Sequence, residues 1–275
     1  MKEEHKKGYK ILLSILKPIY LLYYRPTIIN KENIPKEGPI IICCNHIHLF
    51  DQNNILISTK RMIHYMAKKE HLDGKFGWFF KTVGCIRVDR DIHDNIAKEK
   101  ALSLLNNGYA VGIFPEGTRN QVFGKKDINL KLYELYKDKY SYKKFIKILK
   151  KNQVKISELN LLDKLLEEGR INQKDYESNA LNISAYIKEL LSKNIISKEE
   201  YNESIFLPFK YGAVSMAMKT NSKIVPCVIK GKYKFWNNKL TITFGKPIEI
   251  NQNGDTQKYN KILRETMLEE YKNND

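Results

Sequence analysis

The sequence predicts an α/β fold whose core is interrupted by a helical insertion, and two observations support this prediction. Apolar runs typical of buried strands alternate with helical segments along residues 36–120, and such runs return after residue 206. Between them, residues 121–205 are rich in lysine and helical in character, with few strand signals. We therefore predict an amphipathic N-terminal segment (1–35), a first part of the core (36–120), an insertion (121–205) and a second part of the core (206–275).

The apolar runs also place the individual elements. We expect strands at 39–44, 62–67, 83–88, 109–114, 224–229, 240–244 and 247–250, and helices at 52–58, 97–105, 211–220 and 256–272. The dipeptide Asn107-Gly108 ends the helix 97–105. Residues 25–38 contain two prolines and a glycine, and we expect them to form a connector.

Composition limits the possible partners. A hydrophobic content of 42% argues against a disordered chain, and a formal net charge of +17 indicates an anionic partner: nucleic acid, an anionic membrane surface or an acidic substrate. Alternatively, many lysines are merely solvated, as in the products of an AT-rich genome. Because no nucleic-acid-binding motif is visible and the aromatic residues lie in apolar runs, we predict no nucleic-acid partner.

The segment from Tyr9 to Tyr24 is strongly apolar. Its polar residues Lys10, Ser14 and Lys17 recur at helical spacing and form one narrow stripe, which leaves a wide apolar face. The run is shorter than the roughly 20 residues that span a bilayer, and Pro18 interrupts it. Two arrangements stay open: a helix lying in the membrane interface, or a helix packed on the core of the protein itself.

The insertion has an uneven charge and a short repeat. Residues 123–155 contain 11 lysines against 3 acidic residues, whereas residues 156–205 contain 6 basic and 10 acidic residues. The segments LLEEGRINQKDY and LLSKNIISKEEY recur 25 residues apart, with Asn172 and Ser197 where helix N-caps are expected. Two copies suit a small helical hairpin module, weakly similar to SHOCT-type motifs, or a solvated insertion without a function of its own.

Four cysteines, Cys43, Cys44, Cys85 and Cys227, lie in or beside the predicted strands and form no CxxC pair. We expect buried thiols in a reducing compartment, neither disulfides nor metal ligands. No cluster with metal-ligand spacing is visible, and we predict no metal site.

The stretch NHIHLFD, residues 45–51, follows the strand 39–44 and contains a candidate acid–base pair. His46 can act as a general base near neutral pH, and Asp51 can accept its Nδ1 proton and fix its tautomer. On one continuous helix the two side chains would point about 140° apart, so the pair requires a bend between strand and helix. Taken alone, HxxxxD is also compatible with an ordinary turn.

Four blocks, in this order, resemble the PlsC-type glycerolipid acyltransferases. NHIHLFD resembles the NHxxxxD block of that family, GCIRVDR (84–90) the second block, FPEGTR (114–119) the third and IVPCVI (224–229) the fourth. Lys68 stands where the family has a lysine between its first two blocks. The resemblance covers residues 36–120 and 206–250 and implies a mixed-sheet PlsC-like acyltransferase core.

The resemblance implies a transferase that moves a fatty acyl group from acyl carrier protein or coenzyme A to the sn-2 hydroxyl of lysophosphatidic acid, giving phosphatidic acid. It implies His46 and Asp51 as catalytic residues. It implies substrate-phosphate binding by Lys68, Arg90, Glu116, Gly117, Thr118 and Arg119. The acyl thioester is then a co-substrate and no cofactor is expected. The expected partners are a lysophospholipid, the acyl carrier and an anionic membrane surface, at the cytoplasmic side of the cell membrane in a peripheral or monotopic manner.

Three features depart from the family pattern: His48 within the first block, Arg87 within the second, and the insertion, which could dock an acidic acyl carrier. Two alternatives therefore stay open. The same chemistry could use another acceptor, such as glycerol-3-phosphate or another lysolipid, or the chain could bind lipid without catalysis.

Overall fold

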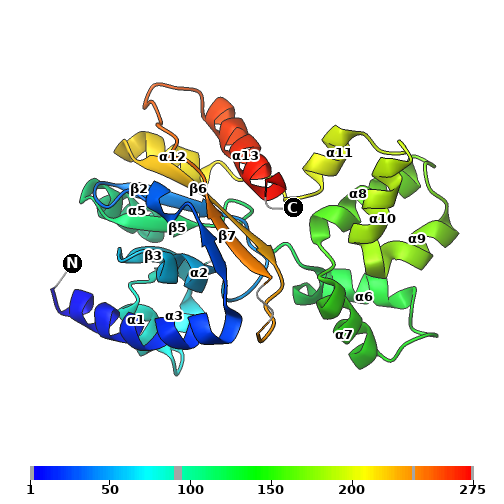
Figure 1. The fold of residues 1–275 in the computed structure, drawn as a ribbon, viewed down its shortest axis with the longest axis horizontal. Coiled ribbons are helices and arrows are strands. Elements are labelled where there is room, and N and C mark those ends of the chain that lie inside the picture. Colours follow the sequence, from blue (N-terminus) through cyan, green and yellow to red (C-terminus); the bar gives the residue numbers. More distant parts are fainter. Residues whose placement is uncertain (1–2, 90–94, 237–238, 274–275) are drawn as a thin grey trace. The chain divides into compact units, whose positions relative to one another are not determined.

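The computed structural model describes residues 3–89, 95–236 and 239–273, and the side chains from residue 7 onward within these ranges. The described chain divides into two compact units (Figure 1). The first unit contains residues 1–117 and 209–275, and the second contains Thr118–Pro208. The predicted insertion 121–205 lies within the second unit. In the described residues, no helix combines the length and apolarity needed to cross a bilayer.

A seven-stranded mixed sheet forms the centre of the first unit, as far as it is described. The spatial order is β1-β7-β6-β2-β5-β3-β4, and every neighbouring pair is parallel except β6 and β7. This mixed sheet with helices confirms the predicted fold class. The strands are β1 (Thr27–Ile29), β2 (Ile40–Cys44), β3 (Ile63–Lys68), β4 (Ile86–Val88), β5 (Ala110–Ile113), β6 (Lys223–Gly231) and β7 (Leu240–Phe244).

The central strand β2 is buried on both faces, which explains its continuous apolar sequence IIICC. It pairs with β5 on one side and with β6 on the other, both in parallel. Because the carboxyl ends of parallel strands meet at one edge of a sheet, the segments that follow β2, β3, β4, β5 and β6 gather at the same edge.

Helices cover both faces of the sheet. In Figure 1, α12 (Gly212–Thr220) and α13 (Thr256–Lys272) lie on one side of the strands, and α1 (Glu3–Tyr24) and α2 (Asp51–Ser58) on the other. The side chains of Ile40, Ile42 and Cys44 pack with Ile55 of α2, as alternation along β2 requires. The remaining helices of this unit are the 3₁₀ turn η1 (Lys31–Asn33), α3 (Lys69–Asp73), α4 (Gly77–Thr82) and α5 (Asn95–Asn106).

The helix α1 has two different faces. Tyr9 and Tyr20 are buried, and the Tyr9 hydroxyl donates to the Arg61 carbonyl oxygen at 3.1 Å. The opposite face is apolar and exposed: Ile11, Ile15, Ile19 and Leu22 are each 55–63% exposed. The helix therefore packs on the core of the protein, as the second of the two open arrangements requires. It also presents an exposed apolar face, as a helix in the membrane interface would require.

The second unit is helical and has its own core. Its helices are the 3₁₀ turn η2 (Val122–Gly124), α6 (Lys126–Glu134), α7 (Tyr142–Asn152), α8 (Ile156–Glu167), α9 (Gln173–Asn179), the 3₁₀ turn η3 (Ala180–Asn182), α10 (Ile183–Ser192) and α11 (Lys198–Glu203). The predicted caps are confirmed: Asn172 accepts from the Asp175 N–H, and Ser197 forms a capping box with Glu200. Phe145, Leu149 and Leu162 are fully buried in this core.

Two local predictions were wrong. Within the predicted connector, Thr27–Ile29 forms the edge strand β1, which pairs only with β7. Residues 247–250 form no strand, because their only sheet contact is an isolated bridge between Ile224 and Ile248. At the next hydrogen-bonding position of β6, Pro226 has no N–H to donate, and its carbonyl oxygen accepts from the Gly245 N–H.

Candidate active site

The segment after β2 brings His46 and Asp51 together. The His46 Nδ1 lies 2.7 Å from the Asp51 Oδ2, and the Asp51 side chain is fully buried. The chain bends over residues 45–50, and α2 begins at Asp51, so the two side chains meet despite their five-residue separation. A carboxylate at the first residue of a helix also interacts favourably with the positive end of the helix dipole.

Four donors converge on the Asp51 carboxylate. Besides His46 Nδ1, the backbone N–H groups of Ile47 and His48 donate to Oδ2 at 2.6 and 2.7 Å. The Tyr233 hydroxyl donates to Oδ1 at 2.5 Å. A buried carboxylate with this many donors has a fixed orientation, because each of its oxygens is held from a different direction.

Two further side chains fix the backbone of this loop. Asn45 continues the pairing of β2 with β6, because its amide accepts from the Ile229 N–H at 2.7 Å and donates to the Ile229 carbonyl at 2.9 Å. The buried Glu116 accepts the His46 N–H at 2.8 Å. Glu116, predicted as a phosphate-site residue, therefore contacts the NHIHLFD loop itself.

The His46 ring is held flat against Phe114, with ring centroids 4.0 Å apart and planes 12° apart. Its side chain is 19% exposed. Because Nδ1 is bound to Asp51 and no described residue bonds Nε2, Nε2 is the ring nitrogen that can meet a substrate hydroxyl. This geometry can support general-base catalysis.

The predicted cations are distributed over both units. Lys68 is exposed at the end of β3, and within the described residues it has no ion-pair partner. Gly117 has a φ of 70° and ends the first unit, whereas Thr118 and Arg119 belong to the second. Arg90 lies outside the described residues.

Lys210 is a cation that the sequence analysis missed. Its N–H donates to the Pro115 carbonyl at 2.8 Å, and its side chain lies over Gly117, where a Cβ would come within 2.8 Å of Cε. This exposed lysine follows the insertion and precedes α12. Because it lies beside the turn formed by residues 115–117, Lys210 is a candidate for anion binding.

The residues that depart from the family pattern have other contacts. His48 stacks on the Tyr233 ring at 4.0 Å, and its Nδ1 accepts the Phe50 N–H at 3.3 Å. Arg87 pairs with Asp73 at 2.9 Å, an ion pair that is half exposed on both sides.

No cysteine in the described structure is suited to act as a nucleophile. All four are free. Cys43, Cys44 and Cys227 are buried, as predicted, whereas Cys85 is only partly buried. Burial raises the pKa of the Cys43 and Cys44 thiols well above its usual range, so both stay protonated. Among the described residues, no group of three or more His, Cys, Asp and Glu side chains is arranged to hold a metal ion.

Comparison with known proteins identifies the core. Residues 25–230 match the Acyltransferase family profile. The chain is 35% identical over 125 residues to a 1-acyl-sn-glycerol-3-phosphate acyltransferase of Bacillus subtilis (strain 168), covering 45% of this chain and 61% of the relative. It is 33% identical over 122 residues to a protein of the same name from Borreliella burgdorferi, covering 42% of this chain and 49% of the relative. The chain thus spans about half to three fifths of these curated relatives.

A solved structure agrees on the fold. The crystal structure of the 1-acyl-sn-glycerophosphate acyltransferase PlsC from Thermotoga maritima superposes with a TM-score of 0.51, at 18% sequence identity, and covers 98% of this chain and 79% of that one. The family profile extends over well more than half of the sequence, from the connector through β6. The chain therefore belongs to the Acyltransferase family.

Proposed function

We propose that this protein transfers a fatty acyl group from an acyl thioester to the sn-2 hydroxyl of lysophosphatidic acid, giving phosphatidic acid. The hydrogen-bonded His46–Asp51 pair at the carboxyl edge of the sheet carries this proposal. The Bacillus and Borreliella relatives, both named 1-acyl-sn-glycerol-3-phosphate acyltransferases, support the choice of acceptor.

The chemistry follows from the geometry of the pair. Nε2 of His46 takes the hydroxyl proton while the alcohol oxygen attacks the thioester carbonyl. Asp51 stabilises the imidazolium that forms. The tetrahedral intermediate then collapses, the carbon–sulfur bond breaks, and the departing thiolate receives the proton from His46. A thiolate leaves readily because the thiol pKa is near 8.5, so neither a second acid nor a covalent acyl-enzyme is required.

The acceptor phosphate needs cations near this site. In the first unit, Lys68 is the last residue of β3, which is linked to β2 through β5, and Lys210 covers Gly117 in the segment after β5. Both lie at the edge where His46 lies, and lysine binds phosphate as a compact charge. Arg90, Thr118 and Arg119 stay predicted contributors to the same subsite.

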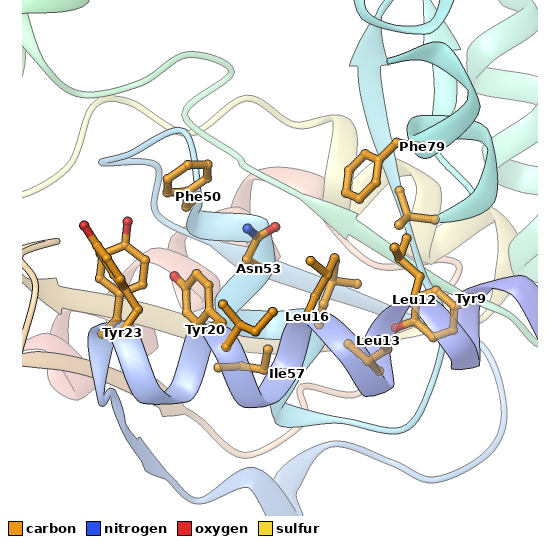
Figure 2. Close-up of a pocket in the computed structure, with 14 residues that line it drawn as sticks. Tyr9, Leu12, Leu13, Leu16, Tyr20, Tyr23, Phe50, Asn53, Ile57 and Phe79 are labelled. Carbon is orange, nitrogen blue, oxygen red and sulfur yellow. The ribbon is translucent and has the colours of Figure 1, made fainter.

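An apolar pocket suits the fatty chain. Figure 2 shows it between α1 and the helices α2 and α4, with Leu16 and Tyr20 on one side and Phe50 and Phe79 on the other. Its volume is about 290 Å³, and Phe50 belongs to the NHIHLFD loop. A chain of methylene groups entering here would exchange water for aliphatic and aromatic side chains.

The exposed face of α1 suits the membrane interface. Its stripe of Ile11, Ile15, Ile19 and Leu22 is continued by Phe235, whose ring lies 4.8 Å from that of Tyr23. Apolar side chains of this size normally face lipid or a partner. Replacing Ile11, Ile15 and Ile19 by serine should reduce co-sedimentation with anionic phospholipid vesicles, while the same replacements at the exposed Leu130 and Ile96 should not.

The donor is proposed to be acyl carrier protein, an acidic partner. Lys143, Lys144 and Lys147 of α7 are exposed, whereas Phe145 and Leu149 of the same helix are buried. Reversing these charges should raise the KM for acyl carrier protein and leave the KM for acyl-coenzyme A unchanged. An equal KM for the carrier in variant and parent would refute the docking role.

Acyl transfer to lysophosphatidic acid by the reconstituted protein, beside its His46→Ala variant, tests the whole proposal. We expect product from the parent and none from the variant. Product from glycerol-3-phosphate instead would assign the other acceptor, and binding of the lysolipid without turnover in the parent would favour the non-catalytic alternative.

A further inference from the structure

A chain of side-chain hydrogen bonds runs from the N-terminal helix to the catalytic loop. The Tyr20 hydroxyl of α1 donates to the Asn54 Oδ1 at 2.9 Å. The Asn54 Nδ2 donates to the Tyr233 hydroxyl oxygen, and the Tyr233 hydroxyl donates to the Asp51 Oδ1 at 2.5 Å. These residues come from α1, α2 and the segment after β6, so three separate parts of the chain meet at one carboxylate.

Every bond in this chain points in the same direction, towards Asp51. After Tyr20, each donor also accepts the preceding bond, and such bonds polarise and strengthen one another. Asn54 is fully buried, and both of its amide atoms are used, so its orientation is fixed by its two tyrosine partners. The final donor meets the carboxylate oxygen that His46 does not use.

We propose that Tyr233 and Asn54 are positioning residues for the acyl transfer, and that through them Tyr20 of α1 holds the Asp51 carboxylate in the orientation that aligns His46. The inference rests on the proposed function of the His46–Asp51 pair. It adds to that function residues that act on the Asp51 carboxylate through hydrogen bonds and that lie outside the four family-like blocks.

Both tyrosines are suited to remain donors. Burial, and next the negative charge of Asp51, raises the pKa of Tyr233 well above its usual range. Burial likewise raises the pKa of Tyr20. Neither hydroxyl ionises at physiological pH, so the direction of the chain does not change with pH in that range.

The network also has a consequence for the charge on Asp51. The hydrogen bond from the Tyr233 hydroxyl to Oδ1 partly neutralises the Asp51 carboxylate, which reduces the attraction between this carboxylate and a protonated His46. Without it, the carboxylate stabilises the imidazolium more strongly but is held less firmly. Loss of the Tyr233 hydroxyl should therefore change the pH dependence of the reaction as well as its rate.

Tyr233→Phe tests the proposal with the smallest change, because it keeps the ring that stacks on His48 and removes only the hydroxyl. We expect kcat to fall roughly tenfold, with the KM for lysophosphatidic acid unchanged and the acid limb of the pH–rate profile moved to higher pH. Tyr259→Phe on α13 is the control for loss of a tyrosine hydroxyl. It removes one hydrogen bond, which that hydroxyl accepts from the Asn251 N–H, whereas Tyr233→Phe removes two, and it should leave kcat and the profile unchanged.

Tyr20→Phe tests the link to α1. It also tests the proposal in the event that Tyr233→Phe folds poorly. We expect a fall in kcat of about threefold, and no further fall when it is combined with Tyr233→Phe, because the chain is then already broken. Thermal unfolding of each variant checks that the fold is intact.

The proposal would be overturned if the folded Tyr233→Phe variant had the kcat of the parent. It would also be overturned if the double variant lost kcat by the product of the losses in Tyr20→Phe and Tyr233→Phe. These outcomes are distinct from failure of the proposed function, which would show as a parent without acyl transfer. In that case, nitrogen NMR of His46 in the parent and Tyr233→Phe decides the matter: an unchanged imidazole spectrum would refute the positioning role.

Discussion

Replacement of Asp51 by asparagine should separate catalysis from folding. Among the described residues, three donors meet Oδ2 of the carboxylate, and one, the Tyr233 hydroxyl, meets Oδ1. The asparagine amide can therefore keep its oxygen on the side of His46 and turn its NH₂ group towards Tyr233. That hydroxyl can rotate to accept, because its oxygen has two lone pairs.

The structure sets the size of both effects. Asparagine replaces a charged acceptor by a neutral one, which weakens the three bonds to the side chain of residue 51 and disturbs its contact with Tyr233. This should cost about 2 kcal/mol of unfolding free energy and about 6 °C in Tm. Catalysis loses the attraction between the carboxylate and the forming imidazolium. At about 4 Å between charge centres and an effective dielectric constant of about 20, this attraction is about 4 kcal/mol, or about 1000-fold in kcat.

Acyl transfer by the reconstituted Asp51→Asn variant, measured beside its thermal unfolding, tests this reasoning. We expect a folded protein whose kcat is about 1000-fold below that of the parent. A folded variant with kcat within tenfold of the parent would refute the role of Asp51 in stabilising the imidazolium.

Three further predictions concern other parts of the structure. Lys210→Met should raise the KM for lysophosphatidic acid about tenfold with little change in kcat, whereas Lys219→Met, at an exposed position on α12, should change neither. Gly117→Ala should lower the unfolding free energy by about 1–2 kcal/mol, measured by thermal unfolding, because φ is 70° and the new Cβ would meet the Lys210 side chain at 2.8 Å. In the second unit, the Arg170 guanidinium and next the Ser197 N–H lower the pKa of Glu200 from 4.5 to about 2. The stability that this pair contributes is present above pH 4.5 and lost as the pH falls towards 2, so the Tm difference between parent and Glu200→Gln should shrink over that interval, and a constant difference would contradict it.

Elements whose signals are local could be predicted from the sequence. The charged segment 256–272 was predicted as a helix, and α13 has these bounds because its signals are local: in the structure Asp255 is its N-cap, and the Asp255 side chain accepts from the Gln257 N–H. The caps Asn172 and Ser197 were found for the same reason. By contrast, β1 is only three residues long and exists because β7 offers it a partner. No local pattern specifies such a strand.

The same distinction applies to the candidate site. His46 and Asp51 are five residues apart, and one loop determines their geometry. Tyr233 is 182 residues from Asp51 in sequence, and its hydrogen bond depends on the whole sheet being assembled. The structural role of Asn45 could have been predicted, since a buried side-chain amide at the end of a strand can make the two hydrogen bonds that the next backbone pair of the ladder would make. Lys210 could not, because nothing in its neighbouring sequence indicates contact with Gly117.

The position of β2 between β5 and β6 has a consequence during synthesis. About 110 residues separate the end of β5 from the start of β6, and the whole second unit is made in this interval. At roughly 5–20 residues per second, β6 follows β5 by roughly 5–20 seconds. Through that time the apolar strand Ile40–Cys44 has one edge without its final partner, while the second unit can complete its own core. Newly made chains therefore present this unpaired apolar edge for seconds, and the central strand is where we expect chaperones to act.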